Sequence, residues 1–198
     1  MNKKILHTVF AHTANNFAKK IAIVHGQSSI NYEELNAKST RMSVYLREMG
    51  VKQDIIVGIA LDRSIEYIAS IIAVMKAGGI FLPLDMTLPK NRLDYILKKS
   101  HPSIIIVGSS QKDAVKPQFK SLGIDEKQTP LIEIDQNLAL WPSINETHVT
   151  GIESHADDSI YIMYTSGSTG APKAILGQNK SLSHFVHWEK RNLNWMIN

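Results

Sequence analysis

Apolar and polar residues alternate along the chain in blocks that predict strands and helices in turn. Short apolar runs rich in β-branched residues predict strands at 21–24, 29–31, 55–61, 80–84, 103–107, 131–135 and 160–164. Apolar residues at helical spacing predict helices around residues 6–17, 31–49, 65–77, 89–97 and from 179 or 181 onward. Because strands alternate with helices, we expect an α/β fold with a layered, largely parallel sheet and flanking helices.

Local signals set several of these boundaries. Asn31, followed three positions later by Glu34, predicts a capping box at the start of a helix that Gly50 ends. Ser64 is a candidate N-cap for residues 65–77, and Gly78 follows that helix. Residues 111–157 are mostly polar, so we expect a surface region there with a single strand at 131–135.

Composition narrows the class of protein. The chain has 198 residues, 43% of them hydrophobic, and carries a net charge of +4 without any run of like charges. This length fits one globular domain or part of a larger one. We expect no nucleic-acid partner, because the excess charge is spread over a solvated surface. There is no cysteine, which excludes disulfides and thiolate chemistry. No apolar run has the length of a signal peptide core or a membrane span, so we expect a cytoplasmic protein without a membrane partner.

One stretch, residues 159–173, carries candidate chemistry. The predicted strand 160–164 runs into Thr165-Ser166-Gly167-Ser168-Thr169-Gly170, in which each residue is glycine or bears a small hydroxyl, and Lys173 follows Pro172. Glycine lets backbone N–H groups approach an anion closely, so this loop is a candidate cradle for nucleotide phosphates. Neither the P-loop pattern nor the dinucleotide fingerprint is present. A solvent-exposed turn is the alternative that composition alone leaves open.

The string Y-T-S-G-S-T-G-A-P-K at 164–173 resembles the signature loop of the acyl-adenylate-forming, AMP-binding superfamily. In that family the loop holds the β- and γ-phosphates of ATP while a carboxylate attacks the α-phosphate. The resemblance implies ATP and Mg²⁺ as cofactors. It also implies that the phosphates are bound by Thr165, Ser166, Gly167, Ser168, Thr169, Gly170 and Lys173. Ala174 is a departure, since the family usually has glycine there.

A second block, residues 76–85 (K-A-G-G-I-F-L-P-L-D), is similar to the second conserved block of amino-acid adenylation domains in nonribosomal peptide synthetases. This similarity favours an amino-acid-activating domain over an acyl-CoA synthetase, which stays the alternative within the family. It implies ATP and an amino acid as substrates, with a carrier-protein domain as a further partner. We assign this block a scaffolding role.

The family's domain is more than twice as long as this chain. We therefore expect residues 1–198 to form a partial adenylation domain that lacks the rest of the large subdomain and the mobile C-terminal subdomain. No catalytic residue is expected here, and the chain is expected to be inactive alone or to need the missing half in trans. The alternative is a non-catalytic nucleotide-binding or interaction module. Strands that the missing half would cover should leave apolar faces exposed.

A metal site within the protein is not expected. His184 and His187 could share one face of the last helix, since they are three residues apart. No further set of ligands accompanies them, so a partly solvated helix face is the interpretation we adopt.

Overall fold

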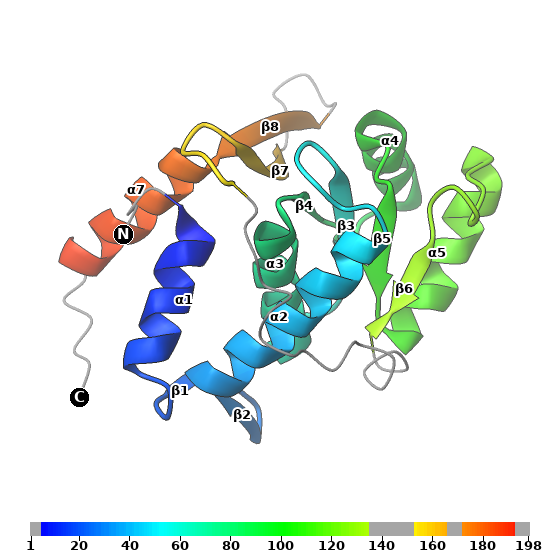
Figure 1. Ribbon diagram of the computed structural model, residues 1–198. Coiled ribbons are helices and arrows are strands. Elements are labelled where there is room, and N and C mark those ends of the chain that lie inside the picture. The colour runs from blue at the N-terminus through cyan, green and yellow to red at the C-terminus, as the bar shows by residue number, and fades with distance from the viewer. Residues whose placement is uncertain (1–4, 135–152, 166–171, 193–198) are drawn as a thin grey trace.

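Two sheets and a surrounding set of helices make up the computed structural model, which describes residues 5–134, 153–165 and 172–192 (Figure 1). The smaller sheet is an antiparallel ribbon of β1 (Ile21–His25) and β2 (Ser28–Asn31). The larger sheet has six strands in the order β6-β5-β3-β4-β7-β8. They are β3 (Ile56–Ala60), β4 (Ile80–Pro83), β5 (Ile104–Val107), β6 (Leu131–Glu133), β7 (Ser159–Thr165) and β8 (Lys173–Gln178).

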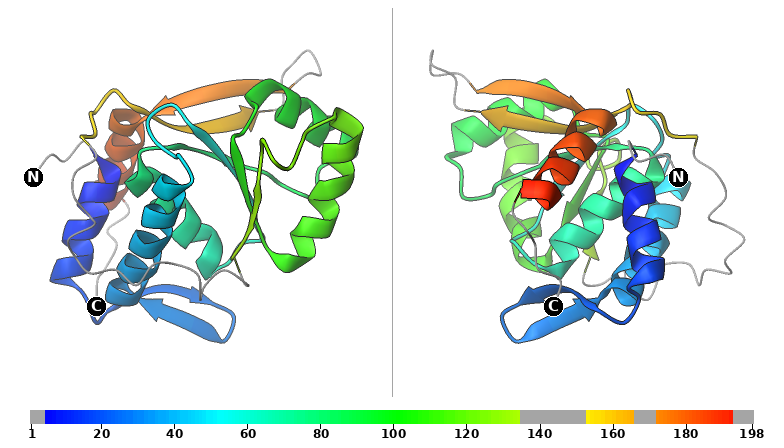
Figure 2. Two further views of the ribbon diagram at one scale, coloured as in Figure 1. Left: turned by 45° about the vertical axis from the view of Figure 1, so that its right-hand side comes forward. Right: turned by 90° about the vertical axis from the view of Figure 1, so that its left-hand side faces the viewer.

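The larger sheet is parallel except at one edge. Neighbouring strands from β6 to β7 pair in parallel, and only the last pair, β7 with β8, is antiparallel. Helices connect the parallel strands from β3 to β6 in chain order, and helices cover the sheet on both faces (Figure 2). The helices are α1 (Leu6–Asn16), α2 (Tyr32–Glu48), α3 (Ile65–Ala77), α4 (Lys90–Ser100), α5 (Ser109–Leu122) and α7 (Asn179–Asn192). The predicted layered, largely parallel α/β sheet with flanking helices is confirmed.

The core lies in two layers because strand residues alternate between the faces of the sheet. On β5, Ile104 and Ile106 belong to the cluster formed with α2 and α3. Ile105 and Val107, one position later in each case, belong to the cluster formed with α4 and α5. A strand that is buried on both faces carries apolar residues at consecutive positions, which is why β5 was clearly predicted from the sequence.

Several predicted helix boundaries are confirmed in atomic detail. Asn31 accepts a hydrogen bond from the Glu34 N–H at 2.8 Å, and the Glu34 carboxylate accepts one from the Asn31 N–H at 3.1 Å. Ser64 Oγ accepts a hydrogen bond from the Tyr67 N–H at the start of α3. Gly78 ends α3 in the left-handed conformation, with φ of 82°. These side chains and this glycine therefore fix where α2 and α3 begin and where α3 ends.

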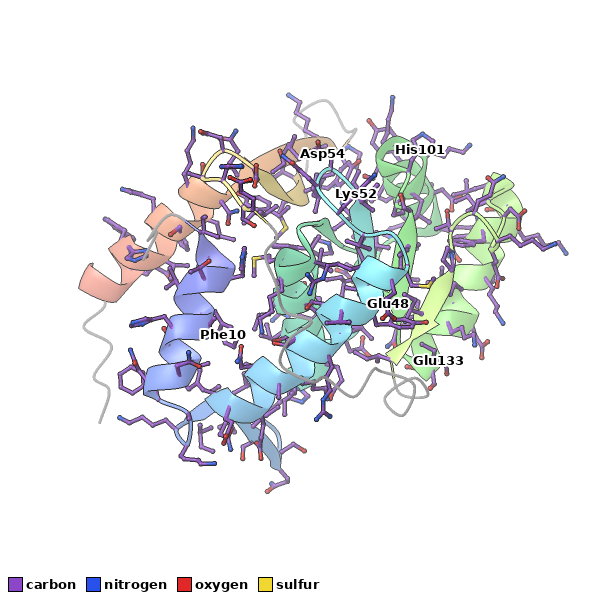
Figure 3. All side chains as sticks on the ribbon, viewed as in Figure 1. Phe10, Glu48, Lys52, Asp54, His101 and Glu133 are labelled. Carbon is purple, nitrogen blue, oxygen red and sulfur yellow. The ribbon has the colours of Figure 1, made fainter. Side chains whose placement is uncertain are left out.

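Two elements were missed by the sequence analysis. Helix α5 lies in the region interpreted as an irregular surface, and it contains Pro117 in its interior. It buries only a single stripe of Gln111, Val115 and Phe119, so its apolar signal is weak. Lys112 on α5 forms an ion pair of 2.6 Å with Glu133, which Figure 3 labels on β6, and this contact ties the helix to the sheet edge. Strand β8 was also missed, and it packs beside β7.

The strand predicted at 131–135 is confirmed as β6, although Asp135 lies outside the described residues. Part of the surface region predicted at 111–157, residues 135–152, also lies outside them. Among the described helices, none is long and apolar enough to cross a membrane.

Candidate phosphate-binding site between β7 and β8

The two described residues of the predicted phosphate site lie side by side. Thr165 is the last residue of β7, Lys173 is the first of β8, and the two are paired opposite each other in the antiparallel ladder. Directly opposed residues in such a ladder project from the same face of the sheet. The other predicted site residues, Ser166, Gly167, Ser168, Thr169 and Gly170, lie outside the described residues.

The side chains of Thr165 and Lys173 suit an anionic ligand. Both are exposed, and neither has a hydrogen bond or ion pair with another residue of the described ranges. Lys173 supplies an ammonium group and Thr165 a hydroxyl donor, and a charged donor makes a stronger hydrogen bond to phosphate oxygens than a neutral one. The arrangement therefore provides a positive charge and a hydroxyl donor on one face at the two ends of the glycine-rich stretch.

Strand β7 forms one ladder pair with its parallel neighbour β4. Tyr161 pairs with Phe81 on β4, and their ring centroids are 5.9 Å apart. The register against β8 is irregular between Ser159 and Tyr161. Such a bulge displaces the alternation of side chains, and in keeping with it Ile160 reaches the core cluster of α2 and α3 whereas Ile162 reaches that of α4 and α5.

The far end of β7 is tied to helix α4. The Tyr164 hydroxyl lies 2.8 Å from Ser100 Oγ, within hydrogen-bonding distance. Ser100 is the last residue of α4 and is buried, and Tyr164 directly precedes Thr165. The sequence analysis missed Ser100, because no local signal connects residues that are 64 positions apart.

The other end of the hairpin is held by a network centred on Asn179, the first residue of α7. Its N–H donates to the Asp158 carbonyl at 3.0 Å, and its side-chain amide donates to the His155 carbonyl at 3.3 Å. Its side-chain oxygen accepts from the Leu6 N–H at 3.3 Å, which links α7 to the start of α1. Asn179 is 2% exposed. One buried amide thus fixes the segment before β7 and the segment after β8 at the same place.

Histidines on α7 do not form a metal site with other described residues. His187 Nδ1 lies 2.7 Å from the Ser183 carbonyl of its own helix, and His184 is exposed. Within the described ranges no group of three or more His, Asp or Glu side chains could hold a metal ion.

A separate cavity of about 380 Å³ lies at the carboxyl ends of β3 and β4. Among its lining residues, Asp85 accepts hydrogen bonds from the N–H and hydroxyl of Thr87 at 2.9 and 2.6 Å. These two bonds, and to a smaller extent the charge of Arg63, lower the pKa of the Asp85 carboxyl. Asp85 is therefore a charged acceptor that already has partners within its own turn.

Sequence comparisons match nearly the whole chain. The sequence model of a family described as "AMP-binding enzyme" matches residues 10–196. The chain is 31% identical to bacitracin synthase 3 of Bacillus licheniformis over 97% of its own length and 3% of that protein. It is 33% identical to tyrocidine synthase 1 of Brevibacillus parabrevis over 91% of its own length and 16% of that protein. It thus spans a small part of these curated relatives.

Solved structures share the fold. VinN in complex with 3-methylaspartate superposes with a TM-score of 0.83 at 20% identity, over 96% of this chain and 52% of VinN. The nonribosomal peptide synthetase FmoA3, bound to α-methyl-L-serine-AMP, gives 0.79 at 23% identity, over 96% of this chain and 20% of FmoA3. The chain therefore shares its fold with part of each of these two proteins. Because the family model matches residues 10–196, this chain belongs to the AMP-binding enzyme family.

Proposed function

We propose that this chain is the ATP-phosphate-binding portion of an amino-acid-activating domain of nonribosomal peptide synthesis. The observation that carries the proposal is the pairing of Thr165 with Lys173, which holds the two ends of the glycine- and hydroxyl-rich stretch together. The proposed ligands of the β- and γ-phosphates are Thr165, Ser166, Gly167, Ser168, Thr169, Gly170 and Lys173. The match to the AMP-binding family and to peptide synthetases supports it.

In this proposal the chain binds and orients the triphosphate. The Lys173 ammonium offsets the negative charge of the phosphates, and the Thr165 hydroxyl donates a hydrogen bond beside it. Mg²⁺ would enter with the nucleotide, because this ion usually keeps several waters and is bound through substrate phosphates and one or two carboxylates. When bound, it would neutralise phosphate charge.

Adenylation works through positioning and charge stabilisation around the α-phosphate and the attacking carboxylate. The proposed phosphate-binding loop provides only one part of that arrangement, so we propose that the chain alone is inactive. Its proposed partners are ATP, an amino acid, a polypeptide that supplies the rest of the domain in trans, and a carrier-protein domain. A cytoplasmic location, where ATP is plentiful, belongs to the same proposal.

Isothermal titration of Mg·ATP into the purified protein tests the proposal. Wild-type protein should bind, and Ser168→Ala and Lys173→Ala should weaken binding. Lys120→Ala is the matched control, because Lys120 is an exposed lysine on α5, which packs against β5 and β6 at the opposite end of the sheet from β8. Folded wild-type protein that does not bind Mg·ATP, or equal losses in all three variants, would overturn the proposal.

A second assay separates an enzyme fragment from a binding module. Amino-acid-dependent exchange of pyrophosphate into ATP should be absent for the chain alone. It should appear when the remaining part of the adenylation domain of tyrocidine synthase 1 is added, if the chain is a competent fragment. ATP binding without exchange in that mixture would favour the alternative of a non-catalytic nucleotide-binding module.

A further inference from the structure

We propose that Ser100 is a positioning residue, whose hydroxyl holds Tyr164 and thereby sets the direction in which the chain leaves β7 for the phosphate-binding stretch. The inference rests on the proposed function, because it concerns the same ligand. It assigns a role to a residue on α4 that is far in sequence from the glycine-rich loop.

The geometry at the end of β7 points to this role. Ser100 Oγ and Tyr164 Oη are 2.8 Å apart, and either oxygen can be the donor. Ser100 is 7% exposed, so the hydroxyl is fixed within the packed end of α4. Tyr164 packs at the edge of the core cluster that contains Leu93, Ile96 and Leu97 of the same helix. A hydrogen bond between two packed groups restrains the Tyr164 side chain more firmly than an exposed one would.

This contact matters because the end of β7, although Ile162 and Tyr164 pack into the cluster with α4 and α5, has few hydrogen-bonded links to the rest of the fold. The parallel pairing of β7 with β4 is limited to Tyr161 and Phe81. From residue 162 to 165, β7 has β8 as its strand partner, and β8 is the last strand of the sheet. Among the described residues, the Ser100–Tyr164 contact is the side-chain hydrogen bond that links residues 162–165 to an element other than β8.

Because Tyr164 directly precedes Thr165, a restraint on the Tyr164 side chain also restrains the candidate phosphate-binding residues. Thr165 is the next residue and is paired with Lys173. A rotation of the hairpin about its single pair with β4 would move both of these residues together. The hydroxyl of Ser100 opposes that rotation. The hairpin is therefore already ordered before ATP binds, and less conformational entropy is lost on binding.

The expected effect is modest and measurable. One hydrogen bond of ordinary strength corresponds to about a fivefold change in affinity. Ser100→Ala and Tyr164→Phe should each raise the Kd for Mg·ATP about fivefold in isothermal titration. The double variant should be no weaker than either single variant, because both substitutions remove the same bond. Ser100→Thr keeps a hydroxyl and should restore part of the affinity.

Tyr95→Phe is the matched control. It removes a tyrosine hydroxyl from the same helix that carries Ser100, and that hydroxyl has no hydrogen bond to the described residues. Its Kd for Mg·ATP should equal that of the wild type. Wild-type affinity in Ser100→Ala and Tyr164→Phe would overturn the inference while leaving the proposed function intact.

Amide hydrogen exchange provides a readout that does not depend on ATP. Exchange at the Thr165 and Lys173 amides should be faster in Ser100→Ala and Tyr164→Phe than in the wild type and in Tyr95→Phe. If the wild type failed to bind ATP, the proposed function would fail, and this exchange pattern would still decide whether Ser100 positions the end of β7. A lower unfolding temperature with unchanged exchange at these two amides would show a merely structural role and would overturn the inference.

Discussion

The ring of Tyr161 on β7 lies directly against the backbone of Gly177, its partner on β8. A Cβ atom placed on Gly177 would be 1.8 Å from Cζ of Tyr161, far inside any real contact. The same ring also packs against Phe81 on β4. Glycine at position 177 therefore gives the aromatic ring the space in which it connects the hairpin to the parallel sheet.

Gly177→Ala should lower the free energy of unfolding by about 2 kcal/mol, because the new methyl group forces the ring or the strand to move. Urea denaturation followed by circular dichroism measures the change. The double variant Gly177→Ala/Tyr161→Ala should not show the sum of the two single losses, since the ring that clashes is gone. Full additivity of the two losses would contradict the steric explanation.

Asn31→Ala should destabilise the protein by about 1 kcal/mol, the usual effect of removing an N-cap side chain. The substitution removes the acceptor for the Glu34 N–H and leaves the Glu34 carboxylate as half of a capping box. Asn31→Asp keeps a side-chain oxygen at the same place and should retain most of the stability. Equal destabilisation by alanine and aspartate would show that the cap hydrogen bond is not the cause. Thermal or urea unfolding of both variants distinguishes these results.

Lys76 on α3 is a largely buried lysine in the interface with α1 and α2. Its ammonium donates hydrogen bonds to Asn36 Oδ1 at 2.7 Å, Thr40 Oγ1 at 2.7 Å and Ser39 Oγ at 2.9 Å. It also lies 5.4 Å from the centroid of the Phe10 ring, which Figure 3 labels on α1. Burial lowers the pKa of Lys76 to about 7.

Stability should therefore rise with pH above about 7. The unfolded chain, in which the lysine pKa is near 10.5, binds this proton more tightly than the folded chain does. Between pH 7 and 9.5 the free energy of unfolding should increase by at most about 1.4 kcal/mol per pH unit relative to Lys76→Met. Urea denaturation of both proteins across this range measures the difference. Parallel pH profiles for wild type and Lys76→Met would disprove the assignment to Lys76.

His7 on α1 acts in the same direction at lower pH. Burial, and to a smaller extent the charge of Lys76, lowers the pKa of the His7 imidazole. The stability cost of protonating His7 is present below its folded pKa and disappears as the pH rises toward its unfolded value of 6.5. Measurements that isolate Lys76 therefore begin at pH 7.

Apolar side chains are exposed along β8 and α7. Leu176 on β8 is 58% exposed, and Phe185 and Trp188 on α7 are 51% and 54% exposed with their rings stacked at 6.4 Å. Exposed apolar surface of this kind favours association between molecules. This finding agrees with the expectation from the sequence that apolar faces would remain uncovered.

Leu176→Lys/Trp188→Lys should reduce self-association at high protein concentration, because it places two charges on this surface. Analytical ultracentrifugation over a concentration series measures the effect. Val24→Lys is the matched control, since Val24 is 71% exposed but lies on the β1–β2 ribbon. An equal reduction by Val24→Lys would show that added charge alone, and not this surface, controls association.

Much of the fold was predictable where the local signals of the sequence, such as helix caps and apolar runs, agree with how the elements pack. The limits of α3 follow from Ser64 and Gly78, and the buried strands follow from apolar runs that are covered by helices on both faces of the sheet. Helix α5 was not predictable in this way, because Pro117 and a polar composition hide its single buried stripe. Strand β8 gave a weak signal for a similar reason, since four of its six residues are exposed at the sheet edge.

The sequence by itself determined the pattern of the candidate site: a strand followed by a glycine- and hydroxyl-rich stretch and a lysine, which resembles the signature loop of the adenylate-forming family. Only the tertiary structure decided that Thr165 and Lys173 pair across a hairpin, that Ser100 meets Tyr164, and that Gly177 makes room for Tyr161. The periodicity of apolar side chains and the residue preferences of turns act over a few residues, so they can be recognised in the sequence itself. Contacts between distant residues depend on how whole elements pack, and that packing is fixed only when the chain folds.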